Sequence, residues 1–193
     1  MGNLILASSS PRRKELLEEL GFHFEVISSD VEELHDISMP LRELCEHNAK
    51  LKAQDIATRN PDKLTLGADT LVYLDSTPLG KPKSREEAYA TLKSLSGRTH
   101  CVCTGLCLVR NDKVEMFSEE TKVHFHTLSD ATIESYLSKV NVMDKAGSYA
   151  IQEQGEMIVK SIEGDYSNVV GLPQGLVKAK IETFSSSVEL TPR

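Results

Sequence analysis

The chain has 193 residues and a formal net charge of −7 at pH 7. This length fits one large domain or two small lobes and allows a substantial buried core. The acidic balance argues against a general binder of nucleic acid or of membrane surfaces, because both carry negative charge. A small anionic substrate remains compatible with it, since a basic pocket can lie in an acidic protein.

The chain shows no targeting or membrane signal. No apolar run reaches the roughly 18 residues of a membrane span, and the N-terminus lacks the pattern of a signal peptide. The four cysteines, at positions 45, 101, 103 and 107, form no disulfide framework. Together these features lead us to expect a cytoplasmic protein.

Residues 4–21 predict a strand, a turn and a helix. Residues 4–6 are an apolar run typical of a buried strand. Ser10 suits the helix N-cap, and Pro11 suits the first helical position. Gly21 is a natural left-handed stop after the leucines that recur at helical spacing.

Arg12 and Arg13 lie in the first turn of this predicted helix, where the helix dipole disfavours cations. Three serine hydroxyls, Ser8 among them, come just before it. A bound anion would neutralise both arginines at the positive helix end, so the pattern indicates a polyphosphate-binding turn. An ordinary capped helix, with its arginines in solvent or paired with Glu15 and Glu18, is the alternative. The stretch is not a P-loop, because GxxxxGK[ST] is absent.

The next elements are a strand at residues 24–28, an acidic turn and a helix at residues 40–59. Lys50 and Lys52 differ by about 200° around this helix, so at most one of them faces a given site. Lys52 lies on the more apolar side. It either contributes to a site or simply extends its amine to water from the edge of the apolar face.

Residues 64–74 predict a strand with Asp69 in its middle. An aspartate in an apolar strand is unfavourable unless it is paired, hydrogen-bonded or bound to a metal. Gly67 is expected to keep the approach open for a ligand. Glu32 and Glu33, just past another strand, could join Asp69 in holding Mg²⁺. The alternative is a turn aspartate between two short strands.

Two further side chains are candidate substrate contacts. Pro82 imposes an extended conformation on Lys81 in Gly80-Lys81-Pro82, which suits a phosphate contact. Gln152 could contact a base edge, because its amide offers both a donor and an acceptor. Both signals are also common on ordinary protein surfaces.

The remaining elements follow from periodicity and turn signals. The expected elements are helices at residues 84–95, 130–140 and 176–184, strands at 99–109, 113–117, 120–126 and 157–162, a loop at 145–152 that enters a strand, and a hairpin turn at 164–165. Residues 185–193 are expected to form a polar C-terminal tail.

Six segments in order resemble the Maf family, once named for septum formation. They are LILASSSPRRKELLEELG at the N-terminus, GADT at 67–70, GKP at 80–82, LSGRTH at 95–100, DKAGSYAIQ at 144–152 and NVVGLP at 168–173. The resemblance implies one α/β domain over residues 1–184, with an elongated bent mixed sheet flanked by helices and two lobes around a central cleft. The inosine triphosphate pyrophosphatases share this fold.

The resemblance also implies an activity. Such enzymes are nucleoside triphosphate pyrophosphatases, which cleave between the α- and β-phosphates and release a nucleoside monophosphate and pyrophosphate. They use a divalent metal cation, Mg²⁺ or Mn²⁺. The implied partner is a nucleoside triphosphate rather than a nucleic-acid polymer or a membrane, and a homodimer is common among relatives.

The resemblance implies a role for a residue of this chain only where the sequence matches a motif of the family. Ser8, Arg12 and Arg13 match the family's phosphate-binding turn. Lys52 matches the lysine of its second helix, and Lys81 matches the lysine of GKP. All five are therefore expected to bind substrate.

The carboxylates take the other roles that the resemblance implies. Glu33 matches the family's acidic residue after the second strand, with Glu32 beside it as the alternative register. Asp69 matches the presumed general base. Whether Asp69 acts as the base or as a metal ligand stays open.

The family has two main substrate branches, and three positions separate them. Arg12, Thr70 and Gln152 agree with the dTTP/UTP pyrophosphatases rather than with the 7-methyl-GTP branch. The expected function is therefore removal of excess or modified pyrimidine triphosphates, a house-cleaning role. A 7-methyl-GTP pyrophosphatase and a nucleotide-binding regulator of cell division with little turnover are the alternatives. The chain departs from the usual pattern at Ala150 and at residues 48–53, which read NAKLKA where LAxxKA is usual.

Overall fold

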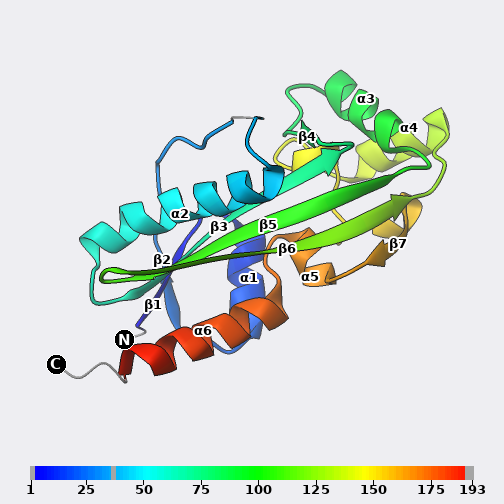
Figure 1. Ribbon diagram of the computed structural model, residues 1–193. Helices are drawn as coiled ribbons and strands as arrows, with labels where there is room; N and C mark the ends of the chain where they lie inside the picture. Colours follow the sequence, from blue (N-terminus) through cyan, green and yellow to red (C-terminus); the bar gives the residue numbers. More distant parts are fainter. Residues whose placement is uncertain (1–2, 36–37, 190–193) are drawn as a thin grey trace. The chain divides into compact units, whose positions relative to one another are not determined.

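The computed structural model describes residues 3–35 and 38–189. Its described strands form one seven-stranded sheet in the order β2-β1-β3-β5-β6-β7, with β4 paired to β3. Both parallel and antiparallel neighbours occur, and helices flank the sheet (Figure 1). The predicted α/β fold with a mixed sheet flanked by helices is confirmed.

The chain divides into two compact units, and strands β3 (Leu64–Leu74), β5 (Thr99–Arg110) and β6 (Lys113–Phe125) run through both. The first unit comprises residues 1–69, 104–119 and 171–193. Its other elements are β1 (Leu4–Ala7), α1 (Pro11–Glu19), β2 (Phe24–Val26), α2 (Leu41–Arg59) and α6 (Gln174–Glu189).

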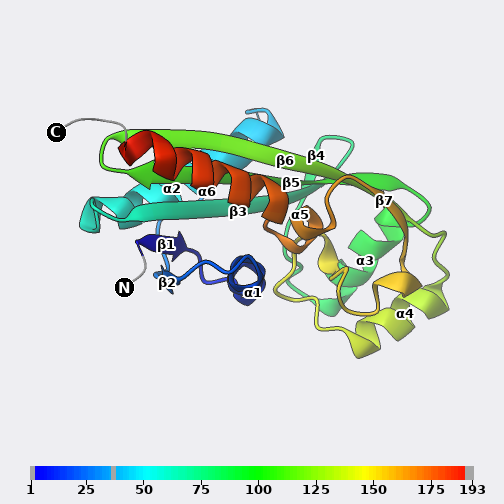
Figure 2. The same ribbon diagram turned by 90° about the horizontal axis from the view of Figure 1, so that it is seen from below.

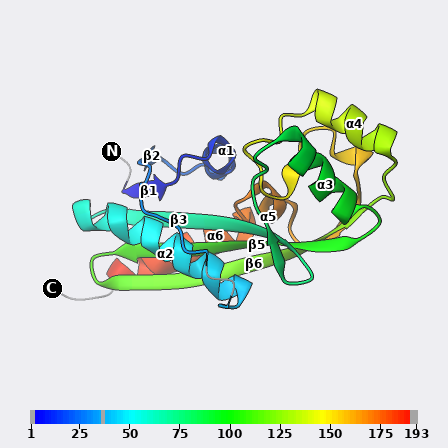
Figure 3. The same ribbon diagram turned by 90° about the horizontal axis from the view of Figure 1, so that it is seen from above.

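In the first unit, helices α2 and α6 lie on opposite faces of the sheet (Figures 2 and 3). Strand β1 pairs in parallel with both β2 and β3, so its four residues are buried between neighbours. Helix α1 follows β1 directly. Ser10 caps it by accepting a hydrogen bond from the Arg13 amide at 3.5 Å, and Pro11 occupies its first position, as predicted.

The second unit comprises residues 70–103 and 120–170. Its own elements are β4 (Thr77–Leu79), α3 (Arg85–Leu95), α4 (Asp130–Lys139), two short 3₁₀ turns (Ala146–Ser148 and Gly155–Met157), β7 (Val159–Glu163) and α5 (Tyr166–Val170). Its core contains three rings packed edge to face, His100, Phe125 and Tyr149, with ring centres 4.9–5.3 Å apart.

Strand β6 is continuous, and the prediction of two strands at residues 113–117 and 120–126 is wrong. Ser118 and Glu119 lie between the two predicted strands. Ser118 is instead buried in the strand, where its hydroxyl accepts a hydrogen bond from Arg42 Nε at 2.6 Å and donates one to Glu46. Both partners belong to α2, so a polar residue is satisfied within the strand by a neighbouring helix.

The segment after residue 144 also differs from its prediction. The loop at residues 145–152 leads into turns rather than into a strand. The buried Tyr136 hydroxyl accepts from the Ala150 amide at 2.9 Å and donates to its carbonyl at 3.2 Å. The Tyr136 hydroxyl thus satisfies the N–H and C=O groups of Ala150, which a neighbouring strand would otherwise pair with.

Residues 164–165 lead into helix α5 rather than forming a hairpin turn. The Asp165 carboxylate accepts from the amides of Ser167 at 2.7 Å and Asn168 at 3.4 Å, which caps α5. The last helix, α6, continues to Glu189, so residues 185–189 are helical rather than part of a tail. Residues 190–193 of the predicted tail lie outside the described residues. Among those described, no helix combines the length and the apolar character needed to cross a membrane.

Candidate functional site

Asp69 lies in the middle of β3 with only 5% of its surface exposed. The strand is continuous through this position, so the alternative of a turn aspartate between two short strands is wrong. Both carboxylate oxygens have partners. Oδ1 lies 2.7 Å from Lys52 Nζ, and Oδ2 accepts a hydrogen bond from Asn48 Nδ2 at 3.3 Å. These contacts offset the unfavourable burial of a carboxylate.

Lys52 bridges two carboxylates from different segments. Its ammonium nitrogen lies 2.6 Å from Glu33 Oε1 and 2.7 Å from Asp69 Oδ1. The Lys52 side chain is 14% exposed, so it does not simply extend to water. The Arg13 guanidinium also interacts electrostatically with both carboxylates, so the two negative charges lie among two positive ones.

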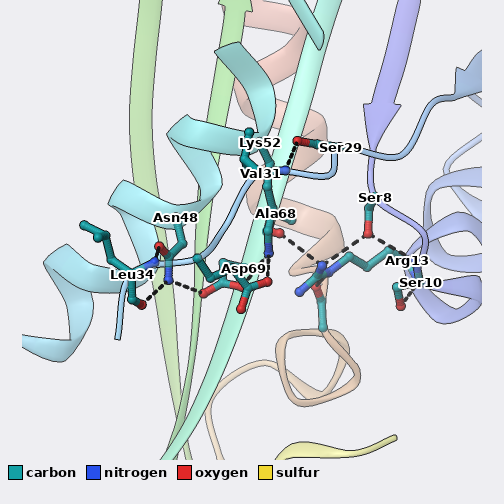
Figure 4. Close-up of polar contacts among 12 residues, drawn as sticks. Ser8, Ser10, Arg13, Ser29, Val31, Leu34, Asn48, Lys52, Ala68 and Asp69 are labelled. Atoms are coloured by element: carbon teal, nitrogen blue, oxygen red, sulfur yellow. Dashed lines mark hydrogen bonds and ion pairs between the residues drawn. The ribbon is translucent and has the colours of Figure 1, made fainter. Parts of the chain in front are cut away.

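Asn48 is a member of this cluster that the sequence analysis did not single out. Its Oδ1 accepts from the Leu34 amide at 2.8 Å, and its Nδ2 donates to the Leu34 carbonyl at 3.1 Å and to Asp69 (Figure 4). The signal that points to it is helical spacing. Asn48 and Lys52 are four residues apart on α2 and therefore share a face.

Arg13 ties three segments of the first unit together. Its Nε donates to the Gly171 carbonyl at 3.0 Å, and its Nη1 donates to the Ala68 carbonyl at 3.0 Å and to Ser8 Oγ at 3.2 Å (Figure 4). Burial lowers the pKa of Arg13, while the neighbouring carboxylates of Asp69 and Glu33 act in the opposite direction. Three donor contacts of this residue are therefore used within the protein.

Ser8 and Arg12 lie at the entrance to α1. Ser8 is buried, and its hydroxyl also accepts from the Ser10 amide at 3.2 Å, so it shapes the turn between β1 and α1. Arg12 is half-buried in the first helical turn, which contains no acidic residue. The first turn of α1 thus keeps its positive end uncompensated by its own side chains.

The other predicted site residues lie outside these contacts. Glu32 is exposed, and its neighbour Glu33 is the residue that meets Lys52. Lys81, Thr70 and Gln152 belong to the second unit. Lys81 and Gln152 are exposed there, and Thr70 is half-buried in β3.

Gly67 serves a purpose different from the one predicted. A Cβ atom at this position would lie 2.2 Å from the Ala49 carbonyl oxygen and 2.9 Å from the Ala53 side chain. The glycine therefore admits the backbone of α2 rather than a ligand. This close approach brings the Asn48–Lys52 face of α2 to Asp69.

The donor set fits a metal that is shared with a substrate. Two carboxylates, Glu33 and Asp69, converge on one point, and Mg²⁺ is commonly held by one or two carboxylates together with substrate phosphates. Within the described ranges, no group of three or more His, Cys, Asp or Glu side chains is suited to hold a metal ion by itself.

The fold and the site define an α/β protein that sets paired carboxylates near a cationic strand–helix turn. The family model described as Maf-like protein matches residues 3–184, and the chain belongs to this family. The predicted family resemblance is confirmed.

Several curated relatives cover almost the whole chain. The dTTP/UTP pyrophosphatase of Akkermansia muciniphila is 51% identical over 170 residues, which cover 88% of this chain and 90% of that protein. The dTTP/UTP pyrophosphatase of Ruminiclostridium cellulolyticum is 44% identical over 191 residues, which cover 97% and 99%. Among solved structures, the Staphylococcus aureus Ham1 protein matches 64% of this chain and 72% of its own at 18% identity, with a TM-score of 0.47.

Proposed function

We propose that the protein is a nucleoside triphosphate pyrophosphatase that hydrolyses dTTP and UTP to the nucleoside monophosphate and pyrophosphate. The observation that carries the proposal is the Lys52 bridge between Glu33 and the buried Asp69. Three relatives that are 44–51% identical over most of the chain bear the name of this activity.

The cations of the site bind the polyphosphate in this proposal. The N-terminal turn of α1 offers its positive dipole and the Arg12 guanidinium to phosphate oxygens. Lys52 adds a second cation from α2, and Lys81 is the further substrate contact that the family resemblance implies. Ser8 and Arg13 fix the shape of the turn through the contacts described above.

Asp69 supplies the base. The carboxylate is held by Lys52 and Asn48, and in this position it can orient the attacking water and accept its proton. The nearby cations stabilise the charge that develops on the leaving pyrophosphate. Glu33 and Asp69 would hold Mg²⁺ or Mn²⁺, which when bound neutralises charge on the phosphate oxygens.

The preference for pyrimidines is assigned to Arg12, Thr70 and Gln152. The Gln152 amide is exposed and offers a donor and an acceptor to a base edge. The pyrimidine preference that these positions imply agrees with the name dTTP/UTP pyrophosphatase that the relatives bear.

The test is pyrophosphate release from dTTP, UTP, CTP, GTP, ITP and 7-methyl-GTP with Mg²⁺ or Mn²⁺. Highest kcat/KM on dTTP and UTP supports the proposal. Highest kcat/KM on 7-methyl-GTP would overturn the substrate assignment, and release from none of the six would overturn the activity.

A matched pair of variants tests the role of Asp69. Asp69→Asn should lower kcat by about 10²–10⁴-fold while nucleotide still binds. Asp112→Asn removes the same charge from an exposed turn of the first unit and should behave like wild type. Full turnover of Asp69→Asn would exclude Asp69 as the base.

A further inference from the structure

We infer that Asn48 is a positioning residue that holds Glu33 against Asp69 and so sets the affinity of this carboxylate pair for a divalent cation. The inference rests on the proposed function of the site. It adds a residue that contacts no substrate and acts only through the two carboxylates.

The segment that carries Glu33 lacks support from regular structure. Between β2, which ends at Val26, and α2, which begins at Leu41, the described residues form neither helix nor strand. Leu34 leaves 40% of its surface exposed, so burial of its side chain contributes little to fixing this segment. The position of Glu33 therefore depends on polar tethers.

Asn48 provides the tether next to Glu33. The side-chain amide pairs with both the N–H and the C=O of Leu34, at 2.8 and 3.1 Å, in the manner of a neighbouring peptide group. Asn48 is 2% exposed, so these bonds form away from water, where an unpaired polar group is costly. The residue that follows Glu33 is thus held at both of its backbone polar groups.

The same amide reaches the second carboxylate. Nδ2 lies 3.3 Å from Asp69 Oδ2, while Lys52 occupies Oδ1. The two residues come from one face of α2 and take one oxygen each, which fixes the plane of the carboxylate. One buried side chain therefore contacts Asp69 directly and the backbone of the residue that follows Glu33.

Only an amide of this length satisfies all three contacts. Leucine, the usual residue at this position of the LAxxKA pattern, has the same branched shape and a larger volume but neither donor nor acceptor. Aspartate would keep one acceptor for the Leu34 amide but would place a negative charge against Asp69. The contacts therefore require Asn48 itself, and they define what its loss removes.

The experiment measures Mn²⁺ binding to the substrate-free protein by calorimetry, together with kcat, KM and the Mg²⁺ concentration for half-maximal rate. In Asn48→Leu we expect Mn²⁺ affinity to fall by about 10–100-fold, the range seen when residues that support metal ligands are changed. The Mg²⁺ requirement should rise in parallel, and kcat at saturating Mg²⁺ should recover more than kcat/KM at low Mg²⁺.

A control on the same helix separates positioning from helix stability. Asn60 lies at the C-terminal end of α2, where its Nδ2 donates to the Ile56 carbonyl at 3.0 Å. Asn60→Leu removes a side-chain amide from the same helix but should leave Mn²⁺ affinity unchanged. Asn48→Ala repeats the test without added apolar volume if Asn48→Leu does not fold.

The outcomes distinguish this inference from the proposed function. A folded Asn48 variant with wild-type Mn²⁺ affinity would overturn the positioning role, even if its turnover were low. Equal losses of Mn²⁺ affinity in the Asn48 and Asn60 variants would also overturn it. If the wild type hydrolysed no triphosphate, the proposed function would fail while Mn²⁺ binding still tested Asn48.

Discussion

At the scale of single residues, the site depends on the ammonium of Lys52. Glu33 and Asp69 carry like charges that repel each other, and Lys52 offsets that repulsion because its ammonium lies 2.6 Å from one carboxylate and 2.7 Å from the other. The same ammonium occupies the region in which a divalent cation would bind. Lys52 therefore has two opposed effects, since it organises the carboxylates and competes with a metal for them.

We predict that Lys52→Met raises Mn²⁺ affinity of the substrate-free protein while it lowers turnover. Loss of a competing charge should strengthen Mn²⁺ binding by about tenfold or more. Turnover should fall because the polyphosphate loses a cation. Calorimetry and pyrophosphate release measure the two effects. Lys50→Met is the matched control, because Lys50 faces a different side of α2; weaker Mn²⁺ binding in the Lys52 variant would contradict the argument.

Arg13 and Arg12 differ in the contacts that they make within the protein. The fork of Arg13 reaches two backbone carbonyls and a serine hydroxyl, which a lysine ammonium cannot match in direction. We predict that Arg13→Lys lowers the free energy of unfolding by about 2–3 kcal/mol, because buried carbonyls lose their donors. Arg12→Lys should change it by less than about 0.5 kcal/mol. Urea unfolding of both variants measures the difference, and equal losses would disprove it.

The sequence singles out most of this cluster but not all of it. Asp69 was recognisable because a carboxylate interrupts an apolar strand, and Lys52 because it lies beside the apolar face of a helix. Asn48 was not recognisable, because its main partner is the Leu34 backbone. Every residue has the same backbone groups, so the sequence does not indicate which of them a side chain will bind. Contacts from side chain to backbone explain what pattern analysis missed here.

At the scale of elements, helix α2 lies unusually close to the sheet at two glycines. A Cβ atom at Gly105 of β5 would lie 2.2–2.4 Å from the backbone of Cys45 and Glu46, and Gly67 of β3 faces Ala49 in the same way. The helix can approach two strands only because both positions lack a side chain. This contact places the Asn48–Lys52 face beside Asp69.

We predict that Gly105→Ala destabilises the protein by about 3 kcal/mol or more. The added methyl meets backbone atoms, which cannot move aside as a flexible side chain could. Thermal and urea unfolding measure the loss. Gly175→Ala in α6, where no heavy atom lies within 4 Å of the added Cβ, should be neutral or stabilising. Similar stability of the two variants would show that α2 can shift away.

The type of an element was predictable where one hydrophobic periodicity dominates its sequence. The prediction failed where a side-chain hydrogen bond replaces or accompanies the backbone hydrogen bonds of a regular element. Helices α1 to α4 and the strand around Asp69 follow their sequence patterns to within a few residues. The continuous strand through Ser118, the turn at Ala150 and the helix capped by Asp165 do not. In each case a side-chain hydrogen bond decides the local structure. Such hydrogen bonds depend on which helices and strands pack together, and the local sequence pattern does not indicate that.

At the scale of the whole molecule, a buried histidine links the free energy of unfolding to pH. His100 is 1% exposed, and its Nε2 lies 2.8 Å from the Tyr149 hydroxyl. Burial, with a smaller contribution from His124, lowers the pKa of His100 from 6.5 to about 4. The unfolded chain therefore binds more protons than the folded protein between these pH values. The stabilisation from neutral His100 is complete above about pH 6.5 and is lost as the pH falls toward 4.

We predict that this single group removes about 3 kcal/mol of unfolding free energy between pH 7 and pH 4, because each pKa unit corresponds to about 1.4 kcal/mol. His100→Phe keeps a ring between Phe125 and Tyr149 but cannot titrate. It should be less stable than wild type at pH 7.5, since Tyr149 loses its partner, and should lose less stability on acidification. Carboxylates titrate in both proteins, so the difference between the two pH profiles isolates His100. His23→Phe, at an exposed position, should keep the wild-type slope, and parallel profiles for wild type and His100→Phe would refute the linkage.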